Sequence, residues 1–187
     1  MNQMFKILRS IHPVSENLRD YLDDNLKEKK VKKREILLKE GQLCGNLYFV
    51  HQGILRGYYS KGGKEISCLF FKEGEVCVDL EGFFTQAHSG ITIQAIEECV
   101  LYYISYAQLQ RIYKEYVEFN IVSRILLERW NVTQFQRFKA MWMQSTYDRV
   151  EWFNTTHPEL NQRVPAKYIA SYLGITDVTL SAAKAKM

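Results

Sequence analysis

The chain has 187 residues, of which 25 are Lys or Arg and 21 are Asp or Glu, so its formal net charge is +4. Hydrophobic residues make up 47% of the chain and aromatic residues 13%, which excludes an intrinsically disordered protein and is enough for a buried core. The longest uninterrupted apolar run, residues 99–104, is far shorter than the roughly 18 residues of a membrane-spanning helix, so we expect no membrane partner.

The N-terminal residues and the cysteines indicate a compartment. Lys6, Arg9 and His12 interrupt the apolar residues near the N-terminus, so we expect no signal peptide. The four cysteines, at positions 44, 68, 77 and 99, form no Cys-x-x-Cys pair and predict neither a zinc site nor a disulfide framework. We therefore expect reduced thiols, no bound metal and a cytoplasmic protein.

Two segments have a local excess of basic residues. Residues 27–40 contain seven basic and three acidic residues, and residues 158–187 contain four basic and two acidic residues. A charge run of this kind is usually a solvated surface, so it does not by itself predict a nucleic-acid partner.

The first half of the chain has the pattern of a β protein, after a short helix predicted at 16–26. Apolar and β-branched runs alternate with glycines, and they predict strands at 35–39, 47–52, 54–60, 66–71, 76–79, 92–96 and 100–105. Gly62 and Gly63 predict a tight hairpin, because both accept the positive φ angles of a primed turn. Many short strands at this spacing indicate an antiparallel sandwich or barrel.

A long helix is predicted over residues 117–143. Neither proline nor glycine occurs between Ser105 and Thr156, and seven apolar residues follow at helical spacing: Phe119, Val122, Leu126, Trp130, Phe135, Phe138 and Trp142. The helix could pack on its own barrel. Its length and its apolar residues on several faces favour instead a seam between two copies, so we expect a homodimer through this helix.

Two short helices joined by a tight turn are predicted at 166–173 and 177–186. Ala170 is small where the helices approach each other, and Gly174 suits the positive φ of the turn. The buried face would consist of Ile169, Leu173, Ile175, Leu180 and Ala183. Thr176 or Asp177 would cap the second helix. This spacing favours a helix-turn-helix unit, and an ordinary pair of packed helices is the alternative.

The second of these helices would face DNA. The predicted contact residues are Thr176, Thr179, Ser181, Ala182, Lys184 and Lys186. A recognition helix of this kind places its exposed side chains in the major groove, while lysines also contact phosphates.

The chain resembles the Crp/Fnr family of bacterial transcription regulators. Its C-terminal motif is similar in sequence to that of members from Bacteroidetes-type bacteria. The residues that support the resemblance are Gly41, the runs 47–53 and 63–65, and the C-terminal stretches 169–176 and 179–181. The resemblance implies an α+β fold with three parts. These are an N-terminal antiparallel β-roll, like that of cyclic nucleotide-binding proteins, at 1–116, a long dimerisation helix at 117–144 and a small helix-turn-helix domain at 145–187.

The resemblance also implies an effector pocket in the β-roll. Its residues would be Val78, Asp79, Ser89, Gly90 and Thr92, with Arg56 and His88 as further candidates. Ser89 stands where cyclic-nucleotide-binding members have the arginine that neutralises the cyclic phosphate. We therefore expect no cyclic AMP and no cofactor, and the effector remains unassigned.

The sequence thus predicts a DNA-binding regulator with an effector-sensing roll and no catalytic residues. A cupin-type metalloenzyme would need a His-x-His pair, and the four histidines are isolated from one another. A second alternative is an effector-binding or protein-interaction module that has lost DNA binding. It rests on Ala182, which stands where family members commonly have an arginine that reads guanine.

Overall fold

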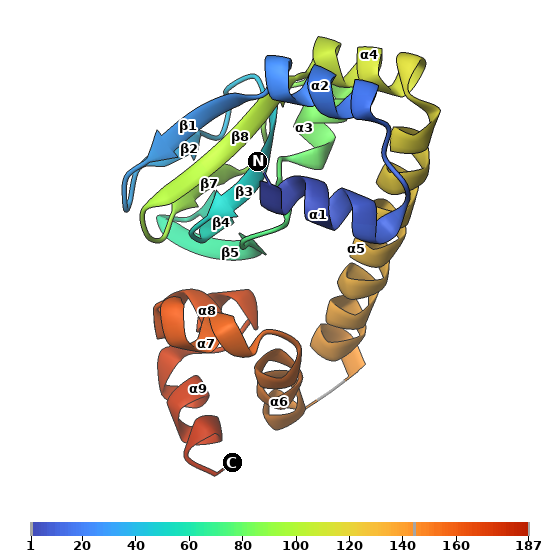
Figure 1. The fold of residues 1–187 in the computed structure, drawn as a ribbon. Helices are drawn as coiled ribbons and strands as arrows, with labels where there is room; N and C mark the ends of the chain where they lie inside the picture. Colours follow the sequence, from blue (N-terminus) through green and yellow to red (C-terminus); the bar gives the residue numbers. More distant parts are fainter. Residues whose placement is uncertain (1, 144, 187) are drawn as a thin grey trace.

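A computed structural model describes residues 2–143 and 145–186 and shows a mixed α and β protein with antiparallel sheets and one long helix (Figure 1). Residues 144 and 187, the last residues of the predicted dimerisation and DNA-binding segments, lie outside the described residues. The strands lie in the first half of the chain, and the C-terminal helices lie beneath them in Figure 1.

Two four-stranded antiparallel sheets form the roll. The strands are β1 (Lys27–Val31), β2 (Ile36–Leu38), β3 (Asn46–Gln52), β4 (Leu55–Lys61), β5 (Lys64–Phe71), β6 (Val76–Cys77), β7 (Thr92–Ala95) and β8 (Cys99–Ser105). One sheet has the order β1-β8-β3-β6 and the other has the order β2-β7-β4-β5. The seven predicted strands are therefore all present, and β1 is an addition within the basic segment 27–40.

The β4–β5 hairpin confirms the predicted tight turn. Lys61 pairs with Lys64, and Gly62 and Gly63 between them have φ angles of 57° and 74°. Both central residues are thus left-handed, as a two-residue primed turn requires. The turn fixes the register of β5, the strand on which the C-terminal helices lie.

Helices cover the roll on the side of the first sheet. They are α1 (Asn2–Ile11), α2 (Glu16–Asn25), α3 (Leu80–Thr85) and α4 (Tyr106–Glu115). Helix α1 contacts β3 and the long helix α5, and it lies between them in Figure 1. Inside the roll, Val50, Leu55 and Leu101 are fully buried, because alternate residues of each strand face the same side.

The long helix α5 (Val117–Met143) has two different halves. Its first half packs Phe119, Val122 and Leu126 against the roll, whereas its second half exposes large aromatic side chains. Phe135 is 68% exposed and Trp142 is 76% exposed. The helix therefore has apolar residues that its own chain does not cover.

The remaining helices form a small unit with its own core. They are α6 (Thr146–Thr156), α7 (Pro158–Arg163), α8 (Ala166–Tyr172) and α9 (Asp177–Lys184). Val150, Phe153 and Leu160 are buried within this unit. Three roll residues join the same apolar cluster: Ile54, Phe70 and Ile96. The C-terminal unit therefore packs directly against the roll.

Candidate functional site

The predicted pocket is centred on Asp79, which lies between β6 and α3. Ser89 donates a hydrogen bond to Asp79 Oδ2 at 2.7 Å, and the backbone N–H of Gly90 donates to the same oxygen at 3.3 Å. The Ser89 hydroxyl also lies 2.8 Å from the carbonyl oxygen of Ile91. Asp79 and Ser89 are both buried. The structure therefore brings Asp79, Ser89 and Gly90 together as a site whose polar groups satisfy one another.

These residues do not fit a cyclic phosphate. An added Cβ at Gly82 would lie 2.7 Å from Asp79 Oδ2 and 3.3 Å from Ser89 Cα, so the three segments are already in close contact. The partners of Asp79 are a hydroxyl and a backbone N–H, and neither supplies the positive charge that would neutralise a cyclic phosphate. We therefore derive no function from nucleotide binding at this place.

The other expected pocket residues point elsewhere. Thr92 accepts a hydrogen bond from the Glu40 backbone N–H, on the face of β7 opposite to Ile91 and Ile93. Val78 is buried and lines a different cavity, while His88 is exposed.

Helices α8 and α9 have the geometry that the sequence predicts for a tight helical pair. Gly174 has a φ of 66° in the connecting turn, and Ala170 is fully buried where the helices meet. The Thr176 side chain accepts a hydrogen bond from the Thr179 backbone N–H and so caps α9. Leu180 and Ala183 are buried, which leaves the opposite side of α9 in solvent.

The six predicted DNA-contact residues differ in their solvent exposure and in their hydrogen bonds. Ser181, Ala182 and Lys186 are exposed, whereas Lys184 donates a hydrogen bond to Asn161 Oδ1 at 3.0 Å. The hydroxyls of Thr176 and Thr179 lie 2.8 Å apart and hydrogen-bond to each other. Val178, which the sequence analysis did not single out, is 79% exposed on the same helix. A valine in the first turn of a predicted recognition helix is the sequence signal that could have identified this residue.

A contact between α8 and β5 fixes the C-terminal unit on the roll. We call this contact, together with the neighbouring residues of β4, α5 and α7, the domain seam. The Ser67 backbone N–H donates a hydrogen bond to Ser171 Oγ at 3.0 Å. The Ser171 hydroxyl in turn donates to the Glu65 carbonyl oxygen at 3.2 Å. One hydroxyl of α8 therefore satisfies two backbone groups of β5.

Arg56, expected in the effector pocket, lies instead in the domain seam and is 99% buried, with a relative exposure of 1%. Its guanidinium donates to Gln94 Oε1 at 2.9 Å and forms an ion pair with Glu65. Two tyrosine rings lie near its Cζ, that of Tyr58 at 4.2 Å and that of Tyr168 of α8 at 3.6 Å. Such cation–π contacts stabilise a desolvated guanidinium.

A second arginine repeats this contact one helical turn along α8. Arg137 of α5 lies 3.9 Å from the centroid of the Tyr172 ring and donates to the Cys68 carbonyl oxygen at 2.7 Å. Tyr168 and Tyr172 are four residues apart and therefore lie on one face of α8. The seam thus joins α8 to both the roll and the long helix.

Ion pairs close the rim of the domain seam. Arg163 of α7 pairs with Glu73 and Glu97, and Lys72 pairs with Glu159. Hydrogen bonds from Arg163 lower the pKa of Glu73 to about 2. Because these side chains are partly exposed, each pair contributes little to stability.

The cysteines are free thiols, and three of the four are buried. Burial raises the pKa of Cys68 to about 11 and that of Cys99 to about 12. Within residues 2–143 and 145–186, the structure contains no group of three or more His, Cys, Asp or Glu side chains arranged to hold a metal ion. None of the described helices combines the length and the apolar character that a membrane crossing requires.

Comparison with known families gives one match. Residues 28–116 match the cyclic nucleotide-binding domain family, which covers all strands of the roll apart from the first residue of β1, together with α3 and α4. A search of curated protein sequences finds no match. Residues 28–116 are therefore similar to a cyclic nucleotide-binding domain, although their Asp79–Ser89 site does not fit the nucleotide.

Solved structures share the fold along most of the chain. FixK2 from Bradyrhizobium japonicum is 20% identical, with a TM-score of 0.67 over 86% of this chain and 83% of that one. The c-di-GMP-responsive global regulator CLP of Xanthomonas campestris is 15% identical, with a TM-score of 0.71 over 92% of this chain and 91% of that one. The catabolite activator protein of Thermus thermophilus is 15% identical, with a TM-score of 0.55 over 96% and 85%.

Proposed function

We propose that the protein is a dimeric, non-enzymatic DNA-binding regulator of the Crp/Fnr type, with α9 as its recognition helix. The observation that supports this most directly is the α8–α9 pair. This pair has a left-handed Gly174 in the turn, a Thr176 cap and a buried apolar face. It lies in the C-terminal unit, which follows the roll and the long helix α5. The exposed residues Ser181, Ala182 and Lys186 would then meet the DNA.

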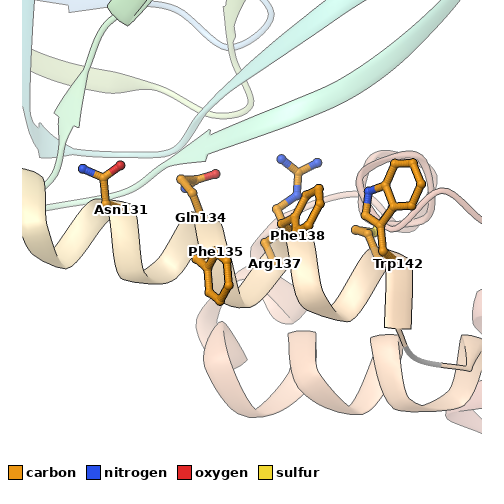
Figure 2. A pocket seen from close by; sticks show the side chains of 7 residues that line it. Asn131, Gln134, Phe135, Arg137, Phe138 and Trp142 are labelled. Atoms are coloured by element: carbon orange, nitrogen blue, oxygen red, sulfur yellow. The ribbon is translucent and has the colours of Figure 1, made fainter.

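The second half of α5 would form the contact between the two copies. Phe135, Phe138 and Trp142 follow at spacings of three and four residues, which is the spacing of a coiled-coil seam. Figure 2 shows them along the helix, beside a surface hollow of about 730 Å³ that α5 residues line. Neighbouring rings lie 6.5 and 5.7 Å apart. A contiguous exposed aromatic surface of this kind is typical of an interaction site.

The domain seam would link effector sensing to DNA binding. Arg56 belongs to the roll, Arg137 to α5, and both contact tyrosines of α8. A change in the roll or in the helix pair would therefore move α8 and, with it, α9. In this mechanism an effector acts by favouring one of two positions of the C-terminal unit.

The test of DNA binding is a selection from a random pool of duplex DNA with the full chain at about 50 mM salt. We expect enrichment of a two-part site whose halves lie about one helical turn apart, because a symmetric dimer reads two half-sites. We expect the affinity to fall steeply with salt, since the lysines contribute phosphate contacts. Failure to enrich any sequence would contradict the proposal.

The same experiment distinguishes the alternative, a module that has lost DNA binding. That candidate is favoured by Ala182 and by the hydrogen bond that holds Lys184 to Asn161. In Ala182→Arg, a DNA-binding protein should gain about tenfold in affinity from a base contact. Ala87→Arg adds the same charge at an exposed site of the roll and should change little. If Ala182→Arg binds DNA and the unmodified chain does not, the unmodified chain is an effector-binding or protein-interaction module that has lost DNA binding.

The dimer is tested by light scattering on Phe135→Ser/Phe138→Ser. We expect a dimer for the unmodified chain and a monomer for the double variant, because both side chains are exposed within one copy. Tyr59→Ser removes another exposed aromatic residue, on β4, and should remain dimeric. A monomeric unmodified chain would overturn this part of the proposal.

A further inference from the structure

A cavity of about 360 Å³ lies outside the interior of the roll, between the first sheet and the helices that cover it. Leu47 and Phe49 of β3 line it, as do Tyr102 and Ile104 of β8, so it adjoins one face of that sheet. Residues of α1, α4 and α5 form the opposite wall. We call it the interlayer cavity. Neither Asp79 nor Ser89 lines it, so it is distinct from the predicted pocket.

The interlayer cavity has the size of a small-molecule site, because such sites have volumes from about 300 Å³ upward. It is partly open to solvent, since Leu127 and Trp130 of its lining are 41% and 37% exposed. Most of its lining is aliphatic or aromatic, and such a surface binds apolar molecules. These properties indicate a site for a ligand with a largely apolar body.

Three polar lining residues lie together where the end of β5 meets the C-terminal unit. The Lys72 backbone N–H donates to the Glu75 carboxylate at 3.1 Å, and the Lys72 side chain forms an ion pair with Glu159, two residues after His157. The remaining walls, from α1, α2, α4 and the sheet, are mainly apolar. The interlayer cavity therefore has a polar end and an apolar end.

His157 is the polar group available to a ligand at that end. Its Nε2 is buried and has no hydrogen-bond partner among the described residues. Burial and the nearby Lys72 lower the pKa of His157, so the ring is neutral at neutral pH. The nearby charge of Lys72 is already paired with that of Glu159. A neutral hydrogen-bonding head fits this end better than an ion, since burying an unpaired charge is costly.

We propose that the interlayer cavity binds an elongated apolar molecule with an uncharged hydrogen-bonding head, of the fatty-alcohol type, with the head on His157. Phe49 and Val76 of the roll, Leu126 of α5 and Leu160 of the C-terminal unit all line the cavity. A bound ligand would therefore contact the roll, α5 and the C-terminal unit, which are the three parts that the proposed regulatory mechanism would move. That consequence rests on the proposed function, whereas the binding itself does not.

The test is calorimetric titration of the purified full chain with 1-decanol, without DNA. We expect one molecule per chain, a negative heat-capacity change from buried apolar surface, and affinity that rises about fourfold per methylene from 1-hexanol to 1-decanol. Decanoate at pH 8 should bind at least tenfold more weakly. Absence of binding, or tighter binding of decanoate, would overturn the proposal. Neither result bears on DNA binding.

Three variants locate the ligand. Leu126→Phe adds bulk inside the interlayer cavity and should weaken 1-decanol binding about tenfold, whereas Ile36→Phe adds bulk on an exposed strand and should leave it unchanged. His157→Phe keeps the ring contacts with Trp152 and Phe153 and should weaken 1-decanol binding, because the head loses its hydrogen-bond partner. If Leu126→Phe does not fold, Ser123→Leu on the same wall replaces it. Unchanged binding in the variant that fills the cavity would refute this location.

Discussion

The molecule contains two buried charged side chains within its described residues, and it neutralises them in different ways. Asp79 receives its hydrogen bonds from Ser89 and Gly90, about ten residues away in the same domain. Arg56 pairs with Glu65 and Gln94 in the roll but also lies against Tyr168, from the other end of the chain. The first charge is satisfied inside the roll, and the second is desolvated only when the C-terminal unit is in place.

This difference separates a site that stabilises one domain from a site that joins two. Loss of the Asp79 contacts should affect the roll alone. Loss of the Arg56 contacts should release α8 as well, because its ring contact and its strand contact lie in the same domain seam. The following predictions test that separation, beginning with the largest effect.

Replacing Arg56 should have the largest effect. We expect Arg56→Ala to lower the free energy of unfolding by about 3 kcal/mol, because it truncates a fully buried side chain and removes its contacts with Gln94 and Tyr168. The stability of Arg56→Lys should lie between that of the unmodified chain and that of Arg56→Ala. Lysine keeps the charge but loses the planar contacts with Tyr58 and Tyr168. Urea unfolding measures stability, and hydrogen exchange should rise in α8. A loss confined to the roll would contradict the comparison.

Replacing Asp79 should have a smaller and more local effect. We expect Asp79→Ala to cost about 2 kcal/mol, because the Gly90 N–H loses its acceptor while Ser89 keeps its bond to Ile91. Asp24→Ala, on an exposed part of α2, is the control. Hydrogen exchange should rise near residues 79–91 and stay unchanged in α8. The effects of Asp79→Ala and Arg56→Ala should add, and a coupling energy above about 0.5 kcal/mol would argue against independent sites.

Removing the Ser171 hydroxyl should weaken the domain seam alone. We expect Ser171→Ala to cost about 1 kcal/mol, since the Ser67 N–H then lacks its acceptor. The amide of Ser67 should exchange faster, whereas Ser60→Ala, at an exposed position of β4, should leave that amide unchanged. Unaltered exchange at Ser67 would show that the hydroxyl does not hold the strand.

Acid should weaken the rim of the domain seam slightly. The pKa of Glu73 is lowered from 4.5 to about 2 by Arg163, so its contribution is complete above about pH 5 and is lost as the pH falls from 4.5 toward 2. The effect should stay below about 1 kcal/mol because both side chains are partly exposed. Glu73→Gln should flatten stability across this range, and exposed Glu98→Gln should not. An equal slope in both variants would contradict the assignment.

Local patterns were enough to predict much of the fold. Glycine punctuation located the strands, and helical spacing located α5 and the α8–α9 pair. Strand β1 was not predicted, because its sequence of Lys, Glu and Val lacks the apolar alternation of a half-buried strand. It is the outermost strand of its sheet, where charged side chains are tolerated. Helix α1 was also missed, since its burial depends on β3 and α5.

The candidate sites divide in the same way. Asp79 and Ser89 lie close in sequence, so the family resemblance brought them together correctly as neighbours. The position of Arg56 could not be predicted, because its partner Tyr168 belongs to a distant helix. The same holds for Ser171, which is 104 residues from Ser67. No local pattern encodes such contacts, and they become visible only when the C-terminal unit lies on the roll.

The hydroxyl of Ser171 also protects the chain from self-association. β5 is the last strand of its sheet, and the backbone groups of Glu65 and Ser67 would otherwise form an open edge. Open edges recruit strands from other molecules and promote aggregation. A roll separated from its C-terminal helices should therefore be prone to β-sheet aggregation. Helix α8 thus also covers the edge of the sheet that β5 would otherwise expose.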